Sequence, residues 1–170
     1  HHMGMHHVEN NHEEDASSTM RYQRDSLSDF LKYVGRFLFI GLIDTFNYFF
    51  SRNRKKFYMR LTFGELSFYL ACVALWFVNW QATLFIFLIP FFFARIVMMI
   101  GNWTQHAFID PSDPDENTIN CINTKYNHTC WNDGYHEVHH TRPALHYTEI
   151  PNEFMKHTER YAENKILVFD

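Results

Sequence analysis

Apolar and polar positions divide the chain into three parts. Residues 1–60 mix polar segments with short apolar ones, residues 61–101 are strongly apolar, and residues 102–170 are polar again. No Asp, Glu, Lys or Arg occurs from residue 66 to residue 94. The two apolar stretches, 62–80 and 82–101, correspond to helices about 28 to 30 Å long, which matches a hydrocarbon core. The pattern predicts an all-α membrane protein with a transmembrane helical hairpin, rather than a buried helix pair in a soluble protein.

A shorter amphipathic helix is predicted before the first span. Ser26 or Ser28 can cap its first turn. Charged residues lie on one face and apolar residues on the other. Such a helix either lies in the membrane interface or packs against its own protein. The charged face contains Asp29, Lys32 and Arg36, and the apolar side contains Phe30, Leu31, Val34, Phe37 and Leu38.

Charge indicates how the hairpin is oriented. Arg or Lys occupies positions 52, 54, 55, 56 and 60, just before the first span. Because basic residues near a span resist translocation, this end is expected in the cytosol, and two crossings return the chain to the same side. Residues 1–60 are then cytosolic or interfacial, residues 61–101 form the hairpin, and residues 102–170 are cytosolic. The net charge of −4 argues against a nucleic-acid partner.

Twelve histidines are unusual for 170 residues, and three groups of them surround the hairpin. A spacing of i, i+3 and i+4 on a helix brings three imidazoles to one face, and neutral imidazoles this close together favour a metal. The predicted topology brings all three groups to one membrane face, so we expect them to converge on one site. The groups are His2, His6 and His7; Asn102 and His106; and His136, His139 and His140.

The histidine pattern indicates that a metal is bound more clearly than it indicates which metal. His136, Glu137 and His140 satisfy the His-Glu-x-x-His pattern of zinc proteases. The additional His139 and the two other groups favour more ligands than the three of catalytic zinc. Imidazole suits iron, copper and zinc alike.

In this order around a hairpin, the groups resemble the histidine boxes of the integral-membrane fatty acid desaturase and hydroxylase superfamily. The resemblance covers nearly the whole chain and implies four membrane helices under a cytosolic helical cap that holds two irons. It implies second-box ligands at His2, His6 and His7, third-box ligands at His136, His139 and His140, an additional ligand at His106, and a water-mediated contact from Asn102. The first box has no counterpart here, so we expect it and two further helices upstream of His1. A chain without them is expected to be inactive alone.

The resemblance also implies a reaction. Reduced di-iron, two Fe2+ ions, activates O2 and removes hydrogen from a methylene of a lipid acyl chain, with electrons from a small haem or iron–sulfur carrier. Two abstractions give a double bond. A fatty acid hydroxylase or alkane-type monooxygenase is the alternative within enzymes, and a non-catalytic membrane metal-binding segment is the alternative outside them. The expected protein is a multi-pass membrane protein whose boxes face the cytosol, and zinc suits it less than iron.

Other polar residues admit two interpretations each. Arg95, in an apolar stretch, either binds a substrate head group or extends to the interface. Asp110, Asp133 and Glu137 either orient metal-bound imidazoles or are solvated. Three cysteines do not form a disulfide framework and indicate a reducing compartment. Cys121, His128 and Cys130 lack a fourth ligand for a zinc knot.

Overall fold

The computed structural model describes residues 1–110 and 118–170. These residues form two compact units, His1–Gly101 and Asn102–Asp170, each of which is described by itself.

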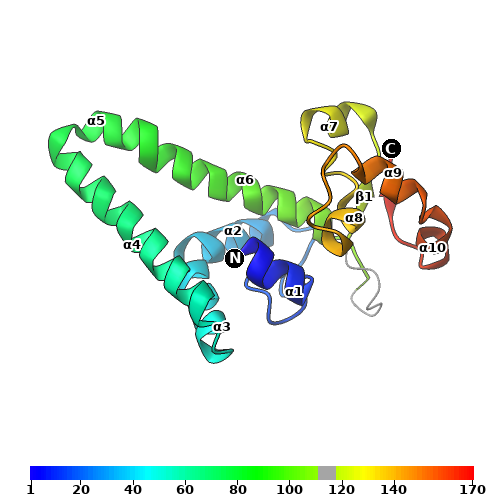
Figure 1. Ribbon diagram of the computed structural model, residues 1–170, viewed down its shortest axis with the longest axis horizontal. Helices are drawn as coiled ribbons and strands as arrows, with labels where there is room; N and C mark the ends of the chain where they lie inside the picture. Colours follow the sequence, from blue (N-terminus) through cyan, green and yellow to red (C-terminus); the bar gives the residue numbers. More distant parts are fainter. Residues whose placement is uncertain (111–117) are drawn as a thin grey trace. The chain divides into compact units, whose positions relative to one another are not determined.

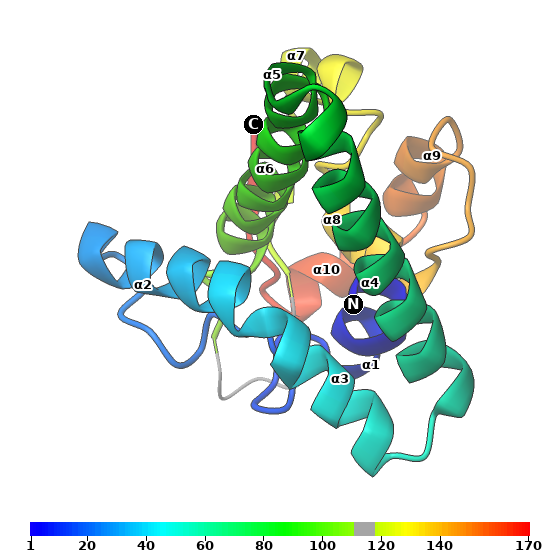
Figure 2. The same cartoon turned by 90° about the vertical axis from the view of Figure 1, so that its left-hand side faces the viewer.

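The first unit begins with a π-helical turn, η1 (His2–His6), followed by one turn of α-helix, α1 (His7–Glu9). After a polar loop come α2 (Leu27–Phe39) and α3 (Gly41–Ser51). The side chain of Ser26 accepts a hydrogen bond from the Asp29 amide at 3.4 Å, which confirms a capped start at the predicted place. Figure 2 shows α2 and α3 following one another and leading into the long helix that comes next.

Two long apolar arms form the predicted hairpin (Figure 1). The first arm is α4 (Lys55–Val78), and the second runs through α5 (Trp80–Thr83), η2 (Leu84–Leu88) and α6 (Ile89–His106). Among the described residues, these two arms are long and apolar enough to cross a membrane. Only 6% of the most apolar stretch of each arm is buried within the protein, which fits lipid-facing helices and not a soluble core.

Both arms are longer than the apolar pattern predicted. The first helix starts at Lys55 instead of residue 62, and the second continues past Gly101 to His106. The apolar run measures only the segment that suits hydrocarbon, whereas the helical hydrogen bonds continue through the basic residues before it and the polar turn after it. At the hairpin turn, Asn79 accepts a hydrogen bond from the Ala82 amide at 2.9 Å and starts the return arm.

The second unit is built from short elements. These are β1 (Asn120–Cys121), α7 (Thr124–Thr129), α8 (His136–Thr141), α9 (Ile150–Met155), α10 (Thr158–Glu163) and β2 (Val168–Phe169), with β1 and β2 paired in parallel. In the part of the chain that the structure describes, the fold is therefore helical apart from this pair of two-residue strands, which the sequence pattern did not predict.

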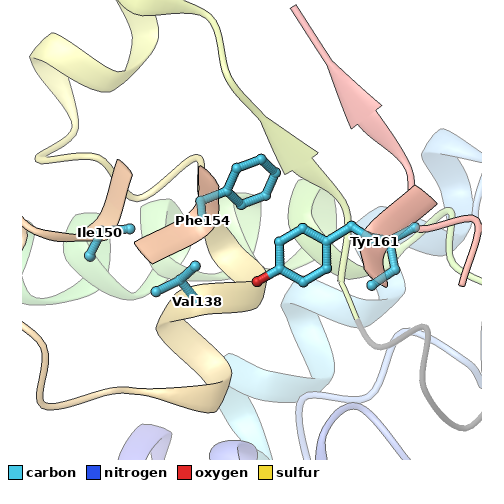
Figure 3. Close-up of a cluster of buried hydrophobic side chains, with 5 residues drawn as sticks. Val138, Ile150, Phe154 and Tyr161 are labelled. Atoms are coloured by element: carbon cyan, nitrogen blue, oxygen red, sulfur yellow. The ribbon is translucent and has the colours of Figure 1, made fainter. Parts of the chain in front are cut away.

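A buried cluster holds the second unit together (Figure 3). Val138 of α8 packs against side chains from α9, from α10 and from the segment that follows it. A helix of six residues is too short to be stable alone, so this packing keeps α8 helical. The cluster consists of Val138, Ile150, Phe154, Tyr161 and Ile166.

Candidate metal centre

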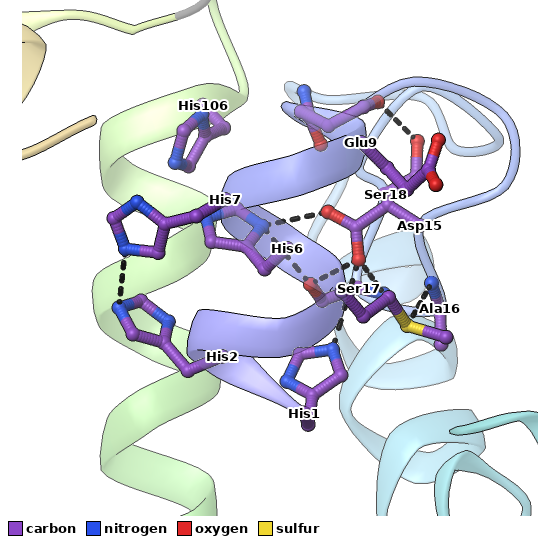
Figure 4. Close-up of polar contacts among 12 residues, drawn as sticks. His1, His2, His6, His7, Glu9, Asp15, Ala16, Ser17, Ser18 and His106 are labelled. Atoms are coloured by element: carbon purple, nitrogen blue, oxygen red, sulfur yellow. Dashed lines mark hydrogen bonds and ion pairs between the residues drawn. The ribbon is translucent and has the colours of Figure 1, made fainter. Parts of the chain in front are cut away.

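The first unit brings three of the predicted ligands together at its start. Nε2 of His2 lies 3.1 Å from Nε2 of His7, and the ring centroids of His2 and His6 are 5.2 Å apart (Figure 4). His2 and His6 are four residues apart, and their rings are stacked on one another. The turn is π-helical, and its i, i+5 repeat places His7 beside His2 as well.

His6 is fully buried against a carboxylate that the sequence analysis did not predict. Its Nδ1 lies 2.6 Å from Oδ2 of Asp15, and Asp15 is itself fully buried. The other carboxylate oxygen accepts hydrogen bonds from Ser17, at 2.8 Å from the amide and 2.7 Å from the hydroxyl. Asp15 lies nine residues after His6 in an irregular loop, so no periodic pattern could have identified it.

The contacts of Asp15 favour the charged form of its carboxyl group. Burial by itself opposes the charge, but the hydrogen bond and the charge of His6, together with the hydrogen bonds from Ser17, hold the pKa of the Asp15 carboxyl below its ordinary value. A carboxylate is a common hydrogen-bond partner of a metal-binding imidazole.

The second unit brings together three more predicted ligands. The Nε2 atoms of His106, at the end of α6, and His136, at the start of α8, are 3.2 Å apart. The His140 ring centroid lies 4.9 Å from each of theirs. One ligand nitrogen from each of the three lies within 4.8 Å of the others, a spacing that a bound ion could bridge. We call His106, His136 and His140 the C-terminal triad.

His139 and Asn102 accompany this triad without belonging to it. His139 is half-buried, and its ring centroid is 5.3 Å from that of His136 and 6.0 Å from that of His140. Asn102 is buried one helical turn before His106. The structure thus places His136 and His140, but not His139, in one ligand group with His106.

The carboxylates near the triad behave differently from one another. Oδ1 of Asp133 lies 3.7 Å from Nδ1 of His136, and its other oxygen accepts a hydrogen bond from Gln105 at 2.6 Å. Glu137 is buried, accepts a hydrogen bond from Thr118 at 3.1 Å and faces Arg160 at 3.8 Å. Asp110 is exposed. Asp133 therefore lies where a carboxylate could orient an imidazole, whereas Glu137 anchors α8.

A close backbone contact sets the start of α8. The Gly134 carbonyl accepts a hydrogen bond from the Cys121 amide at 2.8 Å, and its own amide donates to the Asn127 side chain at 3.0 Å. A Cβ at position 134 would collide with the Cys121 carbonyl oxygen. Glycine two residues before His136 is thus required for strand β1 to approach the third box.

Arg95 is engaged within the hairpin. Its guanidinium lies 2.5 Å from Oε1 of Glu65 on α4 and stacks over the Phe91 ring at 4.2 Å. The position of Arg95 in an apolar stretch indicated a substrate head group or the membrane interface as its partner, and it did not indicate Glu65. Cys72, Cys121 and Cys130 are free thiols, as expected of a chain without a disulfide framework.

The chain matches the fatty acid desaturase family over residues 1–170 and belongs to that family. No curated protein and no solved structure matches it. Family membership confirms the resemblance seen in the histidine boxes and the all-α membrane fold. At the level of the family, the protein is a desaturase-like membrane oxidoreductase.

The residues present fit a metal centre. The C-terminal triad offers three imidazole nitrogens as ligands, and two of its members, His106 and His136, are almost fully buried. Imidazole suits iron, and members of this family typically use two iron ions.

Proposed function

We propose that the protein is a membrane di-iron fatty acid desaturase, which inserts a double bond into a lipid acyl chain using O2 and electrons from a small haem or iron–sulfur carrier. The observation that carries this proposal is the C-terminal triad, found in a chain of the desaturase family at two of the positions of the third box and at the end of a membrane-spanning helix. The proposed metal ligands are His2, His6, His7, His106, His136, His139 and His140, with Asn102 acting through water.

Each part of the chain has a role in this proposal. When bound, a pair of iron ions supplies the oxygen activation that breaking an unactivated C–H bond requires, chemistry that no side chain provides. The imidazoles hold the metal, and their carboxylate partners Asp15 and Asp133 hold the rings in place. Burial of His6, His106 and His136 keeps water away from the ligand nitrogens, which limits side reactions.

The hairpin supplies the access to lipid. Its exposed aromatic and aliphatic side chains suit a bilayer, from which an acyl chain can reach the protein without crossing water. We propose that both ends of the hairpin face the cytosol, which the basic residues 52–60 support. A glycosylation acceptor loop inserted at Gln81 should then be modified in cells, and the same loop inserted at exposed Lys125 should not.

Product analysis in a desaturase-deficient host tests the proposed reaction. The full-length protein should give a new unsaturated lipid and should purify with iron, and replacing His106 with Ala should abolish both. Replacing His128, an exposed histidine of α7, serves as the matched control and should change neither. A hydroxylated product would replace desaturase by hydroxylase. Bound iron without any lipid product would favour the non-catalytic alternative.

A further inference from the structure

The loop between α1 and α2 contains a carboxylate that nothing in the histidine-box pattern anticipates. Asp15 contacts His6 through one oxygen and Ser17 through the other, and all three side chains are buried (Figure 4). We propose that Asp15 is a positioning residue, which fixes the His6 ring so that it binds metal through Nε2. This inference rests on the proposed function, because it assigns a task to Asp15 in the same metal centre.

The hydrogen-bond geometry determines which nitrogen is available. An imidazole has two nitrogens, and Nδ1 is the one that donates here, because it lies 2.6 Å from Oδ2 of Asp15 while Oδ1 accepts two hydrogen bonds from Ser17. The lone pair is then on Nε2. The same contact makes the ring a stronger ligand for a metal and prevents the ring from flipping.

Ser17 determines how the carboxylate faces His6. Its amide and hydroxyl both donate to Oδ1 of Asp15, which leaves Oδ2 directed at the ring. The Ser17 hydroxyl oxygen is also 3.3 Å from Nδ1 of His6. Two polar groups therefore lie at the same ring nitrogen, and the serine restrains both the acid and the imidazole.

The rest of the loop is built to hold this arrangement. Asn11 accepts a hydrogen bond from the Thr19 amide at 2.8 Å, and Ser18 donates to the Asn11 carbonyl at 2.7 Å. Asn10 and Asn11 adopt left-handed backbone angles, with φ of 46° and 63°, that fold the chain back after α1. A buried polar loop is unfavourable unless its polar groups form hydrogen bonds. These hydrogen bonds therefore hold the loop in one position against His6.

A purely structural ion pair is the competing explanation. It would stabilise the loop, and its loss would release both irons together or unfold the protein. A positioning role instead predicts a selective effect on the iron that His6 binds. Removing such an outer carboxylate lowers metal affinity by about 10- to 100-fold in other metalloproteins.

The test uses the full-length, iron-loaded protein with four substitutions: Asp15→Asn, Ser17→Ala, His6→Ala and Asp25→Asn. Asp25 is an exposed acid in the same polar segment and serves as the matched control. Iron affinity is measured by competition with a chelator, and the two iron sites are distinguished by Mössbauer spectroscopy of protein loaded with 57Fe. Asp15→Asn is expected to lower the affinity for one iron by about 10- to 100-fold. The Mössbauer doublet of that iron should change, and the doublet of the other iron should be retained. Ser17→Ala should shift the same doublet with a smaller loss, and Asp25→Asn should match the unmodified protein.

The outcomes separate this inference from the proposed function. If His6→Ala leaves iron binding intact, or if the unmodified protein binds no iron, the metal centre itself is wrong. If His6→Ala loses iron while Asp15→Asn keeps the affinity and both doublets, the positioning role is overturned and the centre stands. Simultaneous loss of both irons in a folded Asp15→Asn protein would assign Asp15 a structural role. If Asp15→Asn does not fold, Ser17→Ala decides the question, and an unchanged doublet there overturns the inference.

Discussion

The guanidinium of Arg95 lies 2.5 Å from the Glu65 carboxylate, which joins the two apolar arms of the hairpin across 30 positions of sequence. Both side chains are about one fifth exposed, and the surrounding contacts are aromatic, with Phe68 stacked on Phe91 at 4.4 Å. Charged side chains at membrane depth are costly unless they are paired. The pair thus lets each residue occupy an apolar helix.

Breaking this pair from one side should destabilise the hairpin more than removing it altogether. We expect Arg95→Met to lower the free energy of unfolding by about 3 kcal/mol, because it leaves an uncompensated carboxylate, and we expect the double variant with Glu65→Gln to recover most of the loss. Denaturation in detergent measures both. If Arg95 instead binds a substrate head group, the double variant will be stable and still fail to turn over its lipid.

The histidines of the third box should differ from exposed histidines in the iron that they retain. His136→Ala and His139→Ala are each expected to abolish product formation and lower bound iron, because loss of one ligand opens the shell and frees the metal. His128→Ala should keep both. Iron content and lipid product are measured on the same preparations. A fully active, iron-replete His139→Ala protein would remove His139, which lies outside the C-terminal triad, from the ligand set.

Asn102 is expected to give a different result from the histidines. A side chain that reaches a metal through water contributes little to retention of the ion but affects how the site handles its remaining ligands. Asn102→Ala should therefore reduce turnover more than it reduces bound iron. Equal losses of both would indicate a direct ligand or a folding defect, and thermal unfolding of the variant distinguishes these two.

Helix α2 should lie at the surface of the bilayer. It buries Tyr33 against its own protein, yet Leu31 and Phe39 remain 60% and 81% exposed, which is unfavourable in water. A fluorophore attached at either exposed position after substitution by Cys should be quenched by spin-labelled lipids. The same label at Lys32, on the charged side of the helix, should be quenched by a water-soluble agent instead. Equal quenching by the water-soluble agent at all three positions would place α2 off the membrane.

Acid should weaken the second unit through Glu153. The pKa of this carboxyl is lowered from 4.5 to about 2 by hydrogen bonds from Lys156 and Arg142, with a further one from His157. The stabilisation is therefore complete above pH 4.5 and is lost as the pH falls toward 2. Glu153→Gln should unfold more easily than the unmodified protein at neutral pH, and the difference should shrink across that interval. Glu163→Gln, at an exposed position, should show no such convergence.

Local sequence patterns predicted the parts of this structure that depend on interactions between residues close in sequence. The capping serine marked the start of α2, the uncharged run marked the hairpin, and the spacing of His136 and His140 predicted one helical face. Each of these depends on residues within one or two turns of one another.

Contacts between distant positions were not predictable in the same way. Asp15 reaches His6 through an irregular loop, Glu65 meets Arg95 only when the hairpin closes, and Gly134 fits against Cys121 only when β1 is in place. The π-helical turn at His2 also departs from the common helical spacing, so the contact of His7 with His2 does not follow from an α-helical pattern. Such contacts depend on how distant segments of the chain pack together, and a single sequence contains no direct signal of that packing.

The packing of Val138 in the hydrophobic cluster makes metal binding by α8 depend on the stability of the second unit. Because α8 is six residues long and depends on that cluster, replacing Ile150 or Phe154 with Ala should disorder the helix that carries His136 and His140. In a screen for lost activity, such variants would resemble mutants of the metal ligands themselves. Many loss-of-function alleles in the last third of the chain should accordingly map to residues that never touch a metal.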